Sequence, residues 1–407
     1  MNSELLNFLA AVVILLVAAK LGGYVSIRLG QPSVLGELLV GILLGPTVLN
    51  MLGAWPLFAG DDHLPESLTL FAEIGVILLM FLAGLELDLR DLLRSGRVAA
   101  LAGSLGVIVP LVSGYATALL LGVDSTEAIF IGLALSATSV SISAQTLMEM
   151  GVLRSKVGLG LLGAAVFDDI LVVLLLSGAS VVFGAAGSET SLGIILLRMI
   201  LFLGGASAVG VFVVPRLIRL VENLPVSQAV PTAALVICFL FAWASEALGG
   251  MAAITGAFMA GLFLARTPYS RPIEHGLSAL AYSLFVPIFL VNIGLQANLR
   301  AISGVAWVLA IALTAVAIIS KVLGSGLGAL AGGFNRRESL RLGVGMISRG
   351  EVGLIVASVA LGAELVSQET FSAVVFMVIV ATLVTPPLLR LTYRNDVPAP
   401  ATRSGSQ

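Results

Sequence analysis

The chain has 407 residues, of which 58% are hydrophobic and only 11% are charged. Soluble domains carry about 25% charged residues, so this composition and the mean hydropathy of +1.10 exclude a soluble protein and indicate a polytopic membrane protein. The net charge of −2 argues against a nucleic-acid partner, and the single cysteine excludes an internal disulfide.

Apolar runs long enough to cross a bilayer, about 20 residues each, follow one another along the chain. We expect an all-α membrane protein with about thirteen transmembrane helices and a disordered cytoplasmic tail at 395–407. The first run lacks a small-residue cleavage site, which predicts a retained helix rather than a signal peptide. The expected spans are 4–27, 33–50, 67–88, 98–121, 126–150, 157–181, 191–217, 229–248, 251–266, 275–297, 304–331, 339–362 and 369–394.

Lysine and arginine gather on one set of the connections between these spans. Sixteen of them lie after odd-numbered spans or at the C-terminal end, and only Arg300 follows an even-numbered span. Because positively charged loops remain in the cytoplasm, this pattern predicts an N-terminus outside the cell and a cytoplasmic C-terminus.

The span at 126–150 contains the stretch LALSATSVSISAQTL at 133–147, in which seven of fifteen side chains are Ser, Thr or Gln. Hydroxyl groups in mid-span bond to backbone carbonyls and distort a helix. Close packing of regular helices through small residues is the alternative. We expect an interrupted helix here.

Two adjacent acids, Asp168 and Asp169, lie near the middle of the span at 157–181. An ionisable side chain at that depth costs roughly 2.5–3.5 kcal/mol on insertion scales. Lys321, in the middle of another span, is the expected partner of one acid, and the other acid points about 100° away. A purely structural ion-pair cluster is the alternative. These three groups leave one negative charge unmatched, which should take up a proton or a cation.

The span at 339–362 contains GVGMISRGEVG at 343–353, where four glycines accompany Arg349 and Glu351. Irregular backbone at membrane depth is tolerated only inside protein or beside a water-filled cavity. The sequence leaves open whether Arg349 pairs with Glu351 or with Glu73.

The two interrupted spans are seven spans apart and therefore run in opposite directions. Interrupted helices at matching places in inverted repeats are typical of secondary transporters with a site near the membrane midplane. At the interruption, Glu351 suits a positive helix N-terminus, and a lysine suits a negative C-terminus.

Taken together, the motifs resemble the bacterial sodium/proton antiporters of the cation:proton antiporter superfamily, in particular their electrogenic Asp-Asp group. They also resemble the membrane domain of the glutathione-gated potassium efflux systems. The resemblance covers about residues 5–394. It rests on GQPSVLGELLVGILLGP (30–46), FAEIGVILLMFLAGLELDL (71–89), ALSATSVSISAQ (134–145), VFDDILVVLLL (166–176), GAFMAGLFLAR (256–266), VPIFLVNIGLQANL (286–299) and GMISRGEVGLIVA (345–357).

The resemblance implies roles for the buried charges. Asp169 matches the carboxylate that carries the ion and the proton, and Asp168 matches the acid that pairs with a lysine, here Lys321. The potassium efflux relatives carry Gln-Asp where this chain has Asp-Asp, which favours sodium over potassium.

It also implies roles for the interrupted helices. Thr138 and Ser139 match the unwound segment beside the ion, and Arg349 and Glu351 match charge-compensating residues of the second interrupted helix. We add Glu73 as an accessory acid.

The resemblance further implies two crossed discontinuous helices and a division into two units. Core helices would lie at 93–185 and 301–394, and scaffold helices at 1–92 and 186–300. The scaffold would form a homodimer in the inner membrane of a bacterial cell, in contact with membrane lipid. We expect no regulatory nucleotide-binding domain in this chain.

These features predict a secondary active transporter, not an enzyme, that exchanges Na⁺ or Li⁺ for H⁺ by alternating access. It would need no cofactor beyond these transported ions. The alternatives are a K⁺/H⁺ antiporter of the same family, a sodium-coupled symporter for organic anions, and an ion channel. A membrane-embedded enzyme lacks support because the two histidines, His63 and His275, lie in expected loops.

Overall fold

The computed structural model describes residues 3–58, 60–61, 63–87, 95–183, 192–222, 225–296, 300, 302, 304, 306–349 and 351–394. Its regular secondary structure in these ranges is helical, as predicted. The helices of the first half are α1 (Ser3–Arg28), α2 (Ser33–Leu44), α3 (Met51–Ala54), α4 (Leu64–Leu85), α6 (Gly96–Leu120), α7 (Ser125–Ser136), α8 (Val140–Glu149) and α9 (Lys156–Phe183).

Three short π-helical turns interrupt the helices of the second half. The elements are α10 (Leu192–Ala208), η1 (Val209–Val213), α11 (Val214–Glu222), α12 (Ala229–Ala244), η2 (Ser245–Gly249), α13 (Ala253–Leu264), α14 (Ser270–Leu280), η3 (Ala281–Phe285), α15 (Val286–Leu295), α16 (Ala306–Gly332), α17 (Arg336–Gly345), α18 (Glu351–Gly362) and α19 (Gln368–Tyr393).

Ten helical segments of the described chain are long and apolar enough to cross a membrane. The helices α2 and α13 are apolar but only 12 residues long, or about 18 Å at 1.5 Å per residue. Helix α2 ends early because Gly45 is extended and Pro46 follows it, which disfavours a helical residue before the proline. The expected number of thirteen spans stays a prediction.

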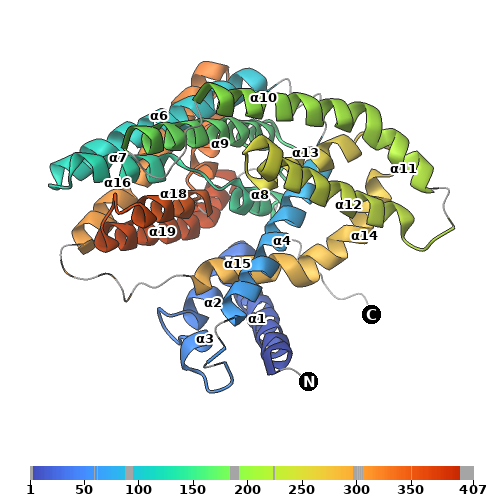
Figure 1. The fold of residues 1–407 in the computed structure, drawn as a ribbon, viewed down its shortest axis with the longest axis horizontal. Helices are drawn as coiled ribbons and strands as arrows, with labels where there is room; N and C mark the ends of the chain where they lie inside the picture. The colour runs from blue at the N-terminus through green and yellow to red at the C-terminus, as the bar shows by residue number, and fades with distance from the viewer. Residues whose placement is uncertain are drawn as a thin grey trace.

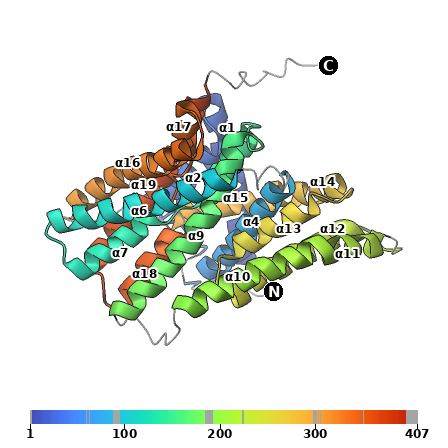
Figure 2. The same cartoon turned by 90° about the horizontal axis from the view of Figure 1, so that it is seen from above.

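The helices pack in two groups (Figures 1 and 2). Helix α6 packs against α7, α9 and α16, and α16 packs against α17 and α19. In the second group α4 packs against α13 and α15, α2 against α1 and α15, and α12 against α13. The groups meet where α8 contacts α4 and α2 and where α9 contacts α10. The site described below lies at this boundary.

Glycines allow the closest helix crossings. A Cβ on Gly41 of α2 would lie 2.1 Å from the carbonyl oxygen of Val291 in α15. A Cβ on Gly261 of α13 would lie 2.0 Å from the carbonyl oxygen of Phe81 in α4. Backbones approach this closely in membranes because small residues leave dispersion contacts as the main attraction between helices.

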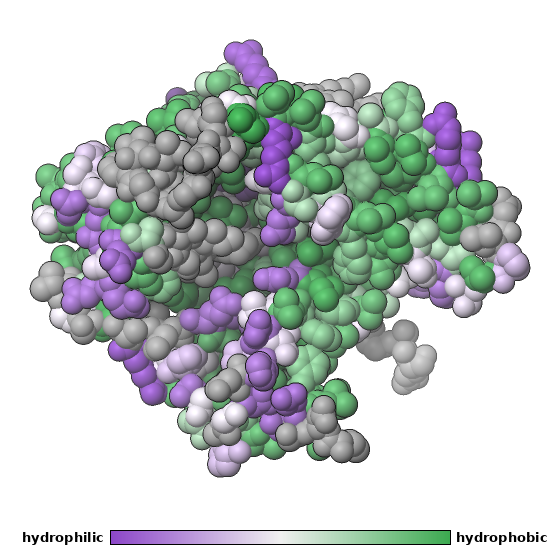
Figure 3. Space-filling view, in the orientation of Figure 1, coloured by the Kyte–Doolittle hydropathy of each residue, from purple (hydrophilic) through white to green (hydrophobic). Residues whose placement is uncertain are grey.

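The outer surface is largely apolar (Figure 3), especially over α10, α11 and α12. Helix α1 shows the pattern clearly, because its exposed large side chains recur at every fourth position. They are Leu5, Leu9, Val13, Val17 and Leu21. Apolar surface of this extent marks an interaction with a membrane or another protein, and with the apolar spans it identifies a multi-pass membrane protein.

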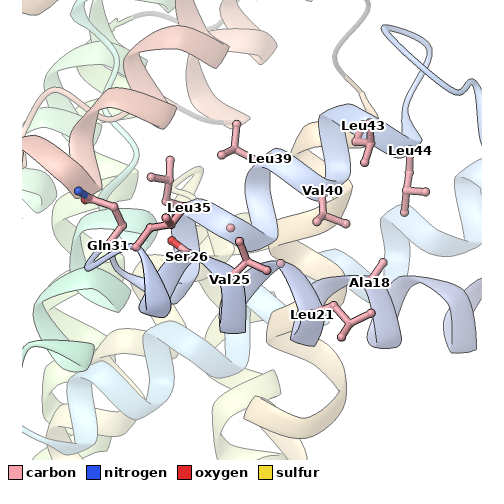
Figure 4. A pocket seen from close by; sticks show the side chains of 13 residues that line it. Ala18, Leu21, Val25, Ser26, Gln31, Leu35, Leu39, Val40, Leu43 and Leu44 are labelled. Atoms are coloured by element: carbon pink, nitrogen blue, oxygen red, sulfur yellow. The ribbon is translucent and has the colours of Figure 1, made fainter. Parts of the chain in front are cut away.

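A groove of about 450 Å³ lies between α1 and α2. Apolar side chains line it, with Ser26 and Gln31 near one end (Figure 4). Its lining contains no ionisable side chain, so this groove lacks a group that could exchange a proton for a cation.

Candidate ion-binding site

The first interrupted helix consists of α7 and α8. Helix α7 ends at Ser136, and Ala137 and Ser139 have extended backbone conformations before α8 begins at Val140. The Ser139 N–H donates to the carbonyl oxygen of Ser348 at 2.9 Å. A backbone donor freed by the interruption is therefore satisfied by the other interrupted helix, as burial requires.

The second interrupted helix, α17 and α18, crosses the first in the opposite direction. The hydroxyl of Ser143 in α8 donates to the carbonyl oxygen of Gly345 at the end of α17, whereas α7 packs against α18. The first half of each helix thus lies beside the second half of the other. The prediction of two crossed discontinuous helices is confirmed.

Beside this crossing, Lys321 of α16 forms an ion pair with Asp168 of α9. Its Nζ lies 2.8 Å from Asp168 Oδ1 and also donates to the carbonyl oxygens of Ser136 at 2.8 Å and Gly106 at 2.7 Å. Both side chains of the ion pair are 0% exposed. An ammonium group has three N–H donors, so these contacts satisfy all of them.

Both carbonyl oxygens are available for local reasons. Gly106 lies four residues before Pro110, which has no N–H to donate to it. Ser136 ends α7, where helix carbonyls lack partners and carry a partial negative charge. Gly106 was not among the predicted site residues, although Pro110 within an expected span was a usable signal.

Arg349 is fully buried and binds backbone oxygens. Its guanidinium donates to the carbonyl oxygens of Ala137 and Ala317, while its own carbonyl oxygen accepts from Thr382. Glu73 is exposed on α4.

Glu351 begins α18, but its side chain lies outside the described residues. Arg349 also interacts electrostatically with Asp168 and Lys321. Counting Arg349 gives two positive and two negative groups in this cluster, so the unmatched negative charge expected without it does not remain among the described residues.

Asp169 has different surroundings from Asp168 although they are neighbours. It is partly exposed and lines a cavity of about 20 Å³ together with Val140, Met80, Thr255 and other residues of α4, α9 and α13. The Thr255 hydroxyl lies 3.4 Å from Asp169 Oδ2. The cavity therefore has walls from both helix groups, near the centre of the molecule (Figure 1).

Two predicted residues of the interruption place oxygen atoms near the crossing. The side chain of Thr138 is buried, and its Oγ1 has no hydrogen-bond partner in the described part of the chain. The same holds for Asp168 Oδ2. The hydroxyl of Ser139 lies 2.9 Å from that of Ser141. Oxygen atoms of these kinds are the ligands that hard cations prefer.

The arrangement gives two neighbouring acids two chemical capacities. Asp168 is held as a carboxylate by a saturated lysine inside one helix group. Asp169 borders a cavity larger than the roughly 10–15 Å³ that holds one water. Asp169 is thus the acid with room to take up either a proton or a small cation. Thr255 is the residue that the sequence motifs missed, because the matching stretch begins one position later, at Gly256.

Curated relatives align with the chain almost from end to end. The Na(+)/H(+)-K(+) antiporter GerN of Bacillus cereus is 42% identical over 388 residues, which are 95% of this chain and 96% of that protein. The Na(+)/H(+) antiporter of Enterococcus hirae is 36% identical over 95% of this chain and 98% of its own length.

Among solved structures, the sodium proton antiporter MjNhaP1 from Methanocaldococcus jannaschii has a similar fold. Its structure at pH 8 has a TM-score of 0.70 at 18% identity, over 96% of this chain and 97% of that chain. The family model described as "Sodium/hydrogen exchanger, transmembrane" matches residues 12–392. The chain therefore belongs to the sodium/hydrogen exchanger family and is a transporter rather than an enzyme.

Proposed function

We propose that the chain exchanges Na⁺, or Li⁺, for H⁺ across the bacterial cell membrane, with Asp169 as the group that carries either ion. One observation supports this most directly. Asp169 borders a small cavity between the two helix groups, whereas its neighbour Asp168 is sealed with Lys321. The names of the relatives, all sodium/proton antiporters in the examples above, agree with this exchange.

The buried oxygens without partners support a cation site. Buried polar atoms are nearly always hydrogen-bonded, so each exception requires an explanation. Asp168 Oδ2 and Thr138 Oγ1 are such atoms within the described ranges. A sodium ion bound by ionised Asp169 would give them a partner, together with the backbone carbonyls and Ser139 of the interruption. Protonation of Asp169 would release the ion.

Alternating access would follow from movement of one helix group against the other. We assign 93–185 and 301–394 to the moving core and 1–92 and 186–300 to the scaffold. The Asp169 cavity has walls from both units, so sliding of the core would open the cavity to the opposite side. Occupancy shifts this equilibrium only because the ion or proton binds the two states differently.

The charge balance supports an electrogenic cycle. With Lys321 and Arg349 charged, ionised Asp168 and Asp169 leave the cluster neutral. Sodium binding adds a positive charge to a buried site, which loss of a proton from Lys321 would remove. Two protons would then move against one sodium.

The orientation and the assembly are part of the same proposal. The distribution of lysine and arginine favours an N-terminus outside the cell and a cytoplasmic C-terminus. We infer a homodimer that forms through the scaffold helices, with lipid around it. K⁺/H⁺ exchange is a second candidate, because the printed name of GerN includes potassium.

The proposal is tested with purified protein in liposomes that contain a pH-sensitive dye. Pulses of Na⁺, Li⁺ or K⁺ should dissipate a preformed pH gradient in the wild type. Asp169→Asn should reduce the signal to that of protein-free liposomes, and Glu73→Gln, at an exposed site in α4, should retain it. Exchange by Asp169→Asn would disprove the carrier assignment. Cation flux without proton movement would instead indicate a channel or a symporter.

A further inference from the structure

Thr255 is the polar side chain that the second helix group places beside Asp169. It lies in the first turn of α13, is 4% exposed, and its hydroxyl oxygen is 3.4 Å from Asp169 Oδ2. Both residues line the same cavity of about 20 Å³. The contact connects the two helix groups, since Asp169 belongs to α9 and Thr255 to α13.

The chain fixes Thr255 in this position by a sharp reversal. Gly250 has a φ of +65°, which only glycine adopts readily, and Ala252 is extended before α13 begins. At about 18 Å, α13 is too short to span the membrane, so one of its ends lies at membrane depth. Gly261 holds α13 directly against the α4 backbone. Thr255 therefore moves with α4 and α13, not with Asp169.

The distance between the two oxygens suits a shared cation. A relaxed O–H···O hydrogen bond measures about 2.7–2.8 Å, so the 3.4 Å separation is long for direct contact alone. Na⁺ has nearly the ionic radius of Ca²⁺, whose oxygen ligands lie at about 2.3–2.6 Å. Two such ligands at a right angle are about 3.4 Å apart. Li⁺ requires a shorter separation and K⁺ a longer one.

We propose that the Thr255 hydroxyl is a sodium ligand supplied by α13, which completes the Asp169 site and favours Na⁺ over Li⁺. This inference rests on the proposed function, because it assumes that Asp169 carries the cation. When α9 moves relative to α13, the site loses this ligand. The conformation described here therefore binds sodium more tightly than the conformation in which α9 and α13 are apart.

The experiment uses the full chain in proteoliposomes on a solid-supported membrane, with transport currents titrated by Na⁺ and Li⁺ at fixed pH. Thr255→Val preserves the side-chain shape and removes the hydroxyl. We expect the Na⁺ concentration for half-maximal current to rise about three- to tenfold. The Li⁺ value should change less than about twofold, and so should the maximal current, because the lost interaction concerns binding.

Two further variants separate ligation from packing. Thr255→Ser retains the hydroxyl and should restore the Na⁺ value to within about twofold of wild type. Thr267→Val makes the same change just beyond the other end of α13, where the hydroxyl bonds only to Leu264, and should leave the current unchanged. If Thr255→Val is not monodisperse, Thr255→Ala asks the same question without the added methyl group.

The inference fails if Thr255→Val has a wild-type Na⁺ value, or if its Na⁺ and Li⁺ values rise equally. A wild type without sodium-dependent current would instead defeat the proposed function. Normal exchange by the wild type, its loss in Asp169→Asn and an unchanged Thr255→Val would overturn the Thr255 assignment alone.

Discussion

Asp168 and Asp169 are adjacent in the chain but differ in almost every physical respect. Asp168 is fully buried inside one helix group and pairs with Lys321. Asp169 points about 100° away and borders a cavity between two groups. Phe167, one residue before them, is 40% exposed on the outer surface. One turn of α9 thus presents an apolar, a paired and an accessible side chain to three environments.

This difference teaches why a transporter benefits from two acids. A single buried carboxylate that both paired with lysine and bound the ion would have to break its ion pair in each cycle. Here the Asp168–Lys321 pair and the carbonyl oxygens of Gly106 and Ser136 form a fixed support. The neighbouring acid remains accessible at the boundary.

Lys321→Ala should have the largest effect on stability, because it leaves the buried Asp168 charge without its partner. Removing one member of a buried pair costs about 3–5 kcal/mol of unfolding free energy. Thermal unfolding of the detergent-solubilised protein measures the loss. Lys20→Ala is the matched control, because the Lys20 side chain is 55% exposed and lies 4.0 Å from Glu37, a geometry that contributes about 0–1 kcal/mol.

The double variant Asp168→Asn with Lys321→Ala sharpens this test. It should be more stable than the sum of the two single changes predicts, because contacting residues do not act additively. Additive losses would show that the two side chains act independently, contrary to the 2.8 Å contact between them.

Thr138→Val should have an intermediate effect and should separate binding from stability. Its hydroxyl has no partner in the described structure, so its removal should not lower the melting temperature. If Thr138 ligates sodium, the half-saturating Na⁺ concentration should rise about three- to tenfold. Thr146→Val is the control, because that hydroxyl already bonds to the Ile142 carbonyl. A lower melting temperature with unchanged sodium dependence would assign Thr138 a structural role.

The smallest effect is expected at Glu338, in an ion pair outside the expected spans. Burial alone would raise the pKa of Glu338, but hydrogen bonds from the Asn335 backbone and from Lys156 together hold it below its usual value of 4.5. The pair therefore stabilises the fold above pH 4.5 and loses this contribution as the pH falls below it. Lys156→Ala should cost only about 0.2–1 kcal/mol at pH 7, and unfolding measured at pH 7 and at pH 4 should show the difference shrink. A loss as large as that of Lys321→Ala would refute the contrast between buried and exposed pairs.

The sequence was sufficient for features that depend on local composition. Hydroxyl-rich and glycine-rich stretches predicted both helix interruptions, and the depth of Lys321 predicted its pairing with an aspartate. The partners of Arg349 could not be predicted, because Ala137 and Ala317 offer only backbone oxygens, which any residue carries. Thr255 escaped notice for a related reason: one hydroxyl in an apolar run acquires meaning only when folding places it beside Asp169.

The span count was harder to predict than the site. A 12-residue helix such as α2 or α13 has the hydropathy of a span without its length. Packing against neighbouring helices through Gly41 and Gly261, rather than length, determines where such a helix ends up. The role of Glu73 and the division into core and scaffold stay predictions.

The central claim is that Asp169 holds either a proton or a sodium ion but not both. Equilibrium binding of radioactive sodium to the purified protein, measured from pH 6 to pH 9, tests it most directly. Competition predicts that in the acidic range the dissociation constant rises about tenfold for each unit that the pH falls, and that Asp169→Asn binds no sodium while Glu73→Gln binds normally. Sodium binding that is independent of pH, or that persists in Asp169→Asn, would contradict the account.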